Sequence, residues 1–175
     1  MKAFGGKVLF LDRDNINTDE IIPAKYLTAS SKSALKKYCL EDLKLPSSSG
    51  KEMVLDDYQV IVTRANFGCG SSREHAAWAL EENGITLVLG ESFARIFRQN
   101  MFNGGMIALE ISKDRADYLF SLSTSGSVTC EVDFKNKQIL FLSDSGKYSI
   151  PLELSPFDNA LVKAGGWVAF ADARY

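Results

Sequence analysis

The sequence predicts an α/β fold in which a parallel-rich sheet flanked by helices is followed by a C-terminal β-meander. Residues 58–63 and 85–89 are short, apolar, β-branched runs, and residues 74–84 between them carry a helical spacing of apolar side chains that ends at a glycine. A strand, a helix and a strand joined by short turns favour parallel pairing with a right-handed crossover. The last third of the chain has short alternating segments joined by tight turns, which predicts the meander.

The composition is that of one folded domain, which we expect to span residues 1–175. The chain is 46% hydrophobic and 24% charged, with a formal net charge of -2 and no basic stripe, which argues against nucleic acid as a partner. No run reaches the about 20 apolar residues of a membrane helix. Three widely spaced cysteines fit a reducing compartment and cannot alone form a four-ligand metal site. We therefore expect a cytoplasmic protein that binds no metal, nucleic acid or membrane.

The first third of the chain predicts one strand, a polar loop and one helix. Lys7 to Leu11 is the strand, and residues 12–23, D-R-D-N-I-N-T-D-E-I-I-P, are rich in Asp and Asn, which favour turns. Residues 30–45 have a helical spacing of apolar side chains and precede P-S-S-S-G at 46–50, a predicted surface loop.

The rest of the chain predicts a helix, a strand, three meander strands and a short helix. They lie at about residues 92–100, 106–111, 127–134, 138–142, 147–151 and 159–163. In the first of these helices we expect Phe93, Ile96 and Phe97 to share the buried face. Gly165 and Gly166 end the last helix.

The stretch N-F-G-C-G-S-S-R-E-H, residues 66–75, joins the first buried strand to the helix that follows it. Such a turn presents unpaired backbone N–H groups and the positive end of the helix dipole, which suits an anion. Its glycines permit positive φ angles, and Ser71 or Ser72 can cap the helix, with Glu74 completing a capping box from Ser71. A turn that only caps a helix explains these residues as well as an anion site does.

Arg73 favours the anion site, because a guanidinium in the first helical turn opposes the dipole unless it meets an anion. The turn matches neither nucleotide-binding glycine motif. A serine hydrolase needs a base beside its serine, and His75 lies too close along the same helix start to form a Ser-His pair. We expect His75 to be structural.

Three segments together resemble the aconitase family and, within it, the small subunits of 3-isopropylmalate dehydratase. They are D-N-I-N-T-D-E-I-I-P-A-K-Y-L-T at 14–28, G-C-G-S-S-R-E-H-A at 68–76 and E-S-F-A-R-I-F-R-Q-N at 91–100. The resemblance implies an aconitase-like swivelling β/β/α domain that docks on a separate large subunit carrying a [4Fe-4S] cluster, while this chain binds none. It also implies a hydro-lyase of leucine biosynthesis that isomerises 2-isopropylmalate and 3-isopropylmalate by dehydration and rehydration.

The resemblance also assigns roles to residues by position. Ser71 is implied as the base that removes and returns a proton next to a carboxylate, and Ser72 and Arg73 as ligands of the dicarboxylate substrate. The loop that discriminates between substrates is implied at three further residues, Tyr26, Leu27 and Thr28. An uncharged residue at position 28 leaves room for an alkyl group, where an arginine would select an additional carboxylate. Ordinary packing explains Tyr26 and Leu27 almost as well.

Two other functions are compatible with the same residues. One is the same chemistry on another 2-hydroxy acid, such as citramalate, dimethylmalate, homoaconitate or citrate. The other is a non-catalytic module that binds an anion or docks on a partner. Arg98 fits the solvated face of a helix, whereas Arg95 and Asp19 fit either a structural or a site role.

Overall fold

The computed structural model describes residues 1–28, 31–43 and 55–175, which form a mixed sheet of seven strands in the order β4-β3-β2-β1-β5-β6-β7. The first four strands pair in parallel: β1 (Gly5–Leu11), β2 (Val60–Thr63), β3 (Leu87–Gly90) and β4 (Ile107–Glu110). The other three form an antiparallel meander on the free side of β1: β5 (Thr129–Asp133), β6 (Gln138–Ser143) and β7 (Gly146–Pro151). The predicted α/β fold with a C-terminal meander is confirmed.

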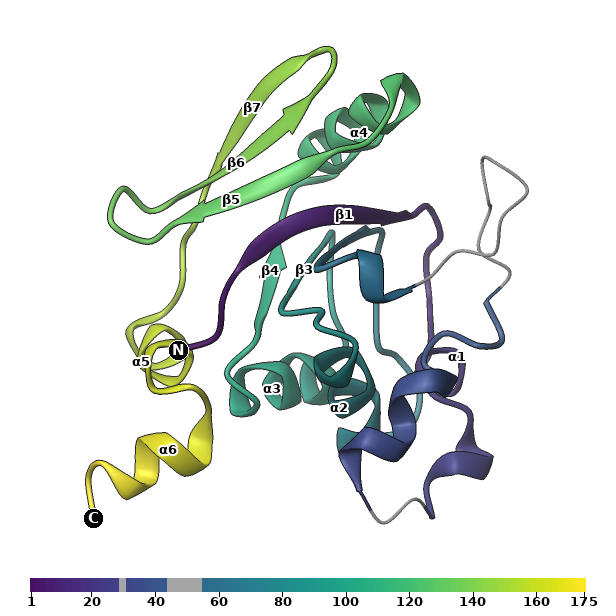
Figure 1. Cartoon of the computed structure of the whole chain (residues 1–175), viewed down its shortest axis with the longest axis vertical. Coiled ribbons are helices and arrows are strands. Elements are labelled where there is room, and N and C mark those ends of the chain that lie inside the picture. The colour runs from purple at the N-terminus through teal and green to yellow at the C-terminus, as the bar shows by residue number, and fades with distance from the viewer. Residues whose placement is uncertain (29–30, 44–54) are drawn as a thin grey trace.

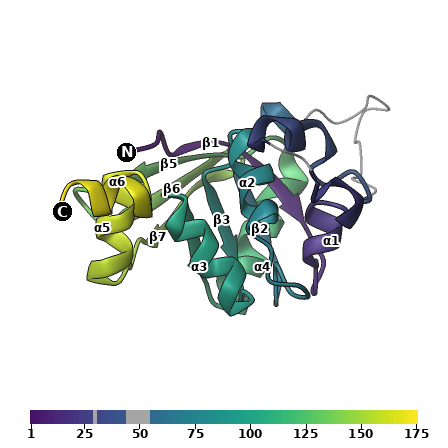
Figure 2. The same ribbon diagram turned by 90° about the horizontal axis from the view of Figure 1, so that it is seen from below.

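Helices cover both sides of the parallel strands. Figure 1 shows α2 (Glu74–Glu82) and α3 (Arg95–Asn103) on one side and α4 (Lys113–Leu122) on the other. Helices α5 (Pro156–Ala164) and α6 (Trp167–Asp172) lie at one end of the molecule, beside the N-terminus (Figures 1 and 2). None of the helices in the described ranges is long and apolar enough to cross a membrane.

The elements around the glycine-rich turn form because their apolar residues can all be buried. Every residue of β2 and of β3 is buried, as expected for strands covered on both faces. In α3 the buried side chains are Phe97, Met101 and Phe102, with Phe93 buried just before the helix. Ile96 is 46% exposed, so the prediction that it shares the buried face is wrong. It lies one position before Phe97, and the core side of the helix is already filled by the aromatic side chains.

The polar segment at residues 12–23 contains a short helix, α1 (Thr18–Ile21), where the sequence predicts only a loop. The helix begins with a capping box: Asn17 Oδ1 accepts a hydrogen bond from the Glu20 amide at 2.9 Å, and the Glu20 carboxylate accepts one from the Asn17 amide at 3.3 Å. The neighbouring Arg13 guanidinium lowers the pKa of the Glu20 carboxyl. Local polar bonds, which a search for apolar periodicity does not detect, stabilise this turn.

The helix predicted over residues 30–45 differs from the structure in type and extent. A 3-10 helix runs from Lys32 to Tyr38 and buries Leu35. The loop predicted at 46–50 lies outside the described residues. Further 3-10 helices are found at Ala24–Tyr26, Leu55–Asp57 and Ser123–Ser125.

Sequence reasoning missed two further helices, α4 and α6. Helix α4 has a detectable start, because the Ser112 side chain accepts a hydrogen bond from the Arg115 amide at 3.2 Å. Its buried residues, Ala116, Leu119 and Leu122, repeat every third position. Helix α6 has no buried residue and no side-chain cap, so neither periodicity nor a cap marks it in the sequence.

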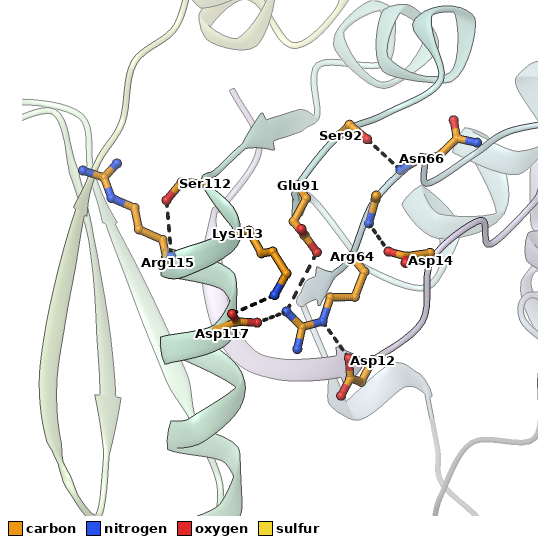
Figure 3. A network of polar contacts seen from close by, with 11 residues as sticks. Asp12, Asp14, Arg64, Asn66, Glu91, Ser92, Ser112, Lys113, Arg115 and Asp117 are labelled. Atoms are coloured by element: carbon orange, nitrogen blue, oxygen red, sulfur yellow. Dashed lines mark hydrogen bonds and ion pairs between the residues drawn. The ribbon is translucent and has the colours of Figure 1, made fainter.

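Arg64, which follows β2, joins α4 to the carboxyl ends of the parallel strands (Figure 3). Its Nε donates to Asp12 Oδ1 at 2.6 Å, its Nη1 donates to Asp117, and Glu91 lies at 3.8 Å. The guanidinium also lies 4.1 Å from the centre of the Phe120 ring. Lys113 and Arg64 together lower the pKa of the Asp117 carboxyl.

Replacing Arg64 by methionine is expected to lower the free energy of unfolding by about 2 kcal/mol at pH 7, because it removes a mostly buried guanidinium that pairs with Asp12, Asp117 and Glu91. The folded-state pKa of Asp117 lies below its ordinary value of 3.8, so its ion pairs stabilise the fold above that pH and this stabilisation is lost as the pH falls through the lower value. The difference between variant and wild type should therefore narrow in acid. Denaturant unfolding at pH 7 and in acid measures both effects.

The control is Lys113→Met, which removes a largely exposed partner of the same carboxylate. It is expected to leave the free energy of unfolding close to that of wild type, because an exposed ion pair contributes little. Equal losses for the two variants would show that Arg64 contributes no more than a surface ion pair.

Candidate active site

The turn between β2 and α2 is held between two segments that lie far from it in the sequence. On one side, the Gly68 amide donates to the Ile16 carbonyl at 2.8 Å and the Thr18 amide donates to the Cys69 carbonyl at 2.9 Å. On the other side, the Phe67 amide donates to the Ser92 carbonyl at 3.1 Å. The three segments that the sequence singled out therefore meet at the carboxyl ends of the parallel strands.

Further bonds fix the start of this turn. The Asn66 amide donates to Ser92 Oγ at 2.7 Å, and the Ala65 amide donates to Asp14 Oδ1 at 2.9 Å (Figure 3). The Phe67 side chain is fully buried against Phe93 and Phe97, with ring centres 6.2 and 5.3 Å away. The backbone that leads to the serines is therefore held by hydrogen bonds and by buried aromatic packing.

Two glycines are required here for different reasons. At Gly68 φ is +81°, and a Cβ would lie 2.2 Å from Cγ of Phe97, so both conformation and space exclude a side chain. At Gly70 φ is +95°, but the nearest atom to a Cβ, Thr18 Oγ1, is 3.5 Å away. Only the backbone conformation demands glycine at position 70.

The prediction that Ser71 or Ser72 caps α2 is wrong. The helix begins at Glu74 with Arg73 as its N-cap residue, and no side chain caps it. The reason is tertiary: Thr18 Oγ1 donates to the Ser71 carbonyl at 3.1 Å and holds this residue against α1, outside the helix. Both serines are exposed at the surface.

Arg73 connects the serine turn to α1. Its Nη1 donates to the Asp19 carboxylate, and its Nη2 lies 3.4 Å from Ser71 Oγ, to which it donates. The Arg73 side chain is 20% exposed and that of Asp19 is 60% exposed. Asp19 is therefore the carboxylate with which Arg73 pairs. The sequence did not predict this contact.

The serine turn lines a small pocket with α1 and the start of α3. Its volume is about 110 Å³, and it is bordered by the side chains of Thr18, Ser71, Ser72, Arg73 and, from α3, Arg95, Ile96 and Phe97. The pocket is open to the surface and is large enough to take a carboxylate group.

Three backbone amides of the serine turn have no acceptor among the residues that the structure describes. Within the described part of the chain, the amides of Ser71, Ser72 and Arg73 donate no hydrogen bond to the protein. Arg95 lies at the first position of α3, whose N-cap residue Ala94 provides no side-chain cap. Two guanidinium groups, free amides and two hydroxyl groups therefore surround a space suited to a carboxylate.

The three residues of the predicted discriminating loop lie elsewhere. Tyr26 stacks on Tyr38 with ring centres 3.7 Å apart, Leu27 is half-buried and Thr28 is exposed. None of them lines the serine pocket. Contact with a substrate stays a prediction for all three.

His75 and Arg98 contact other parts of the fold. The His75 ring lies 4.9 Å from that of Trp78, one turn further along α2, and no hydrogen bond joins it to either serine within the described residues. Arg98 pairs with the largely buried Asp158 of α5 at 3.1 Å. Within the ranges described, no group of three His, Cys, Asp or Glu side chains is placed to hold a metal ion.

Comparisons with known proteins match most of the chain. Residues 2–114 match the family of aconitase C-terminal domains. The chain is 38% identical to the 3-isopropylmalate dehydratase small subunit of Thermodesulfovibrio yellowstonii, over 92% of this chain and 89% of that protein. It is 39% identical to small subunit 2 of this enzyme from Deinococcus radiodurans, over 92% of this chain and 72% of the relative.

A solved structure shows the same arrangement. The crystal structure of 3-isopropylmalate dehydratase from Methanocaldococcus jannaschii superposes with a TM-score of 0.71 at 26% identity, covering 97% of this chain and 93% of the other. The residues matched to the domain family include all three segments that form the serine pocket.

Proposed function

This chain belongs to the family of 3-isopropylmalate dehydratase small subunits, and we propose that it is the small subunit of a hydro-lyase that interconverts 2-isopropylmalate and 3-isopropylmalate in leucine biosynthesis. The observation that carries the proposal is the position of Arg73, whose guanidinium reaches Ser71 Oγ at the mouth of a pocket with room for a carboxylate. The proposed compartment is the cytoplasm, because Cys39, Cys69 and Cys130 are all free thiols.

In the proposed reaction Ser71 is the base that removes and returns the proton on the carbon next to the bound carboxylate. A serine hydroxyl is a weak base unless its alkoxide is stabilised, and free amides beside a guanidinium provide that stabilisation. Ser72 and Arg73 bind the carboxylate. Asp19 leaves the guanidinium when the substrate carboxylate takes its place, so the arginine stays compensated by an anion in both states.

The second half of the reaction, loss of the hydroxyl group from the neighbouring carbon, is proposed to take place against a separate large subunit. When bound to that subunit, a [4Fe-4S] cluster supplies the Lewis acid that this step requires. This division of labour rests on the family, whose members are named as small subunits. Residues of the present chain bind one carboxylate, hold the proton at Ser71 and close one side of the site to water.

Reconstitution tests the proposal. The purified chain, mixed anaerobically with its cognate large subunit, is expected to convert 3-isopropylmalate to 2-isopropylmalate, followed through the absorbance of the dehydrated intermediate. Each polypeptide alone should give no turnover. Failure of the mixture to dehydrate any alkylmalate contradicts the proposal, and turnover of citramalate or dimethylmalate alone would keep the chemistry but change the substrate.

Replacing Thr28 by arginine is expected to shift substrate preference toward a hydroxy acid with an additional carboxylate. A guanidinium in the proposed discriminating loop pairs with that carboxylate and displaces an alkyl group, so the ratio of kcat/KM for citrate to that for 3-isopropylmalate should rise at least about tenfold. Steady-state kinetics on both substrates measure the ratio. The control is Ser33→Arg, which places an arginine at an exposed hydroxyl residue five positions further along the chain. An unchanged ratio in Thr28→Arg would show that this loop does not determine substrate specificity.

A further inference from the structure

The first turn of α3 presents Arg95 and Ile96 at the mouth of the serine pocket. We propose that this turn is part of the surface on which the large subunit docks, and that the large subunit places a carboxylate opposite Arg95 and an apolar side chain opposite Ile96. The inference rests on the proposed function and adds to it the position of the contact.

Arg95 does not stabilise the helix in which it lies. It is the first residue of α3, where a positive charge opposes the helix dipole, and the preceding Ala94 leaves the helix without a side-chain cap. No carboxylate within the described ranges pairs with it, whereas Arg98, one turn later, pairs with Asp158. A positive charge and a missing cap are both unfavourable at the start of a helix. Together they indicate that Arg95 has a function other than stabilising the fold.

Ile96 leaves an aliphatic side chain exposed beside the serine pocket. It is 46% exposed, while the neighbouring Phe93 and Phe97 are 9% and 2% exposed. Exposure of an aliphatic side chain to water is unfavourable. A partner that covers this side chain removes it from water and is stabilised by doing so.

The geometry of the reaction requires the large subunit to come close to this turn. Ser71 lines the pocket that takes the substrate carboxylate, and the two carbons that react are bonded to each other. A group on the large subunit that removes the hydroxyl must therefore come within a few bond lengths of Ser71 Oγ. Any partner at that distance covers the other residues that line the same pocket mouth, and these include Arg95 and Ile96.

The surface continues beyond the pocket mouth. Arg95 also borders a groove of about 570 Å³ that runs between α3, the end of β4, the start of α4 and the end of β7, and its polar lining includes Gln99, Arg115 and Glu153. A hollow next to the pocket offers the large subunit contact area outside the reacting centre. Docking here seals the pocket from water on the α3 side.

The test measures association between the full chain and its cognate large subunit without substrate, by interferometry. Arg95→Glu and Ile96→Asp are each expected to raise the Kd at least about tenfold, as residues at the centre of an interface do. An acidic residue in the first turn favours the helix, so both variants should melt at or above the wild-type Tm and lost binding cannot be ascribed to unfolding. Lys147→Glu on β7 and Val168→Asp on α6 are exposed controls with matched changes, expected to bind as wild type does.

The outcomes separate this inference from the proposed function. If the wild-type chain binds the large subunit and restores turnover, and Arg95→Glu and Ile96→Asp bind equally well, the docking surface is overturned and the proposed function stands. If the wild-type chain binds no large subunit and restores no turnover, both are overturned. Weakened binding in these two variants, with unchanged binding in both controls, supports the inference.

Discussion

Replacing Ser71 by alanine is expected to lower kcat of the reconstituted enzyme by about 1000-fold, the scale of removing a positioned base. Substrate binding should be largely retained, because Arg73 and the free amides of the turn still hold the carboxylate. Steady-state kinetics give kcat, and calorimetric titration of the assembled variant with 3-isopropylmalate gives the Kd. A loss confined to kcat identifies a group that acts in the transition state.

Ser72→Ala is the matched control for this prediction. It removes a hydroxyl from the next residue, and its main expected effect is on KM, because it deletes one hydrogen bond to the carboxylate. Wild-type kcat in Ser71→Ala would contradict the role of base, whereas a non-catalytic anion-binding module predicts no turnover to lose even in the wild-type chain. Labelling of Ser71 by an acylating probe would instead point to a serine hydrolase, and none is expected.

Replacing Arg73 by lysine is expected to lower kcat/KM by about 100-fold, which corresponds to the loss of one or two charge-assisted hydrogen bonds. The guanidinium contacts Asp19 through one nitrogen and Ser71 through another, so it can bind a substrate carboxylate and stabilise the serine alkoxide together. A lysine ammonium is a point charge and cannot keep both contacts in this geometry. Both KM and kcat should therefore change.

Arg13→Lys provides the comparison for Arg73→Lys. Arg13 pairs with Glu20 on the same helix that carries Asp19, but it lies outside the serine pocket. Its replacement should leave kcat/KM close to wild type. If the two lysine variants lose activity equally, the effect belongs to the position of α1, and Arg73 is not a direct ligand.

The sheet was predictable because its strands are encoded locally. Residues 58–63 form a nearly continuous β-branched run that only a strand buried on both faces can satisfy, and β2 is buried throughout. The position of the turn could also be predicted from the local sequence, since Gly68 and Gly70 both adopt the positive φ that glycine allows. The family segments were recognisable for the same reason, as each is a short uninterrupted run.

Two elements could not be found in this way. Helix α6 buries no residue, so its sequence lacks the periodicity that a helix search detects. Helix α1 is four residues long and depends on the reciprocal bonds of Asn17 and Glu20, which resemble ordinary turn chemistry in a polar segment. Both are helices whose stability does not come from an apolar face.

The sequence by itself determined which residues are buried in the parallel strands, where the glycines turn the chain and that Ser71, Ser72 and Arg73 lie together. Only the tertiary structure decided how these residues are used. The order of the strands brings residues 16–19 and 92–96 against the turn, so Ser71 is held by Thr18 outside the helix it was expected to cap, and Arg73 meets Asp19. Local patterns report apolar periodicity and backbone preference, whereas a hydrogen bond between residues more than fifty positions apart exists only once the sheet has assembled.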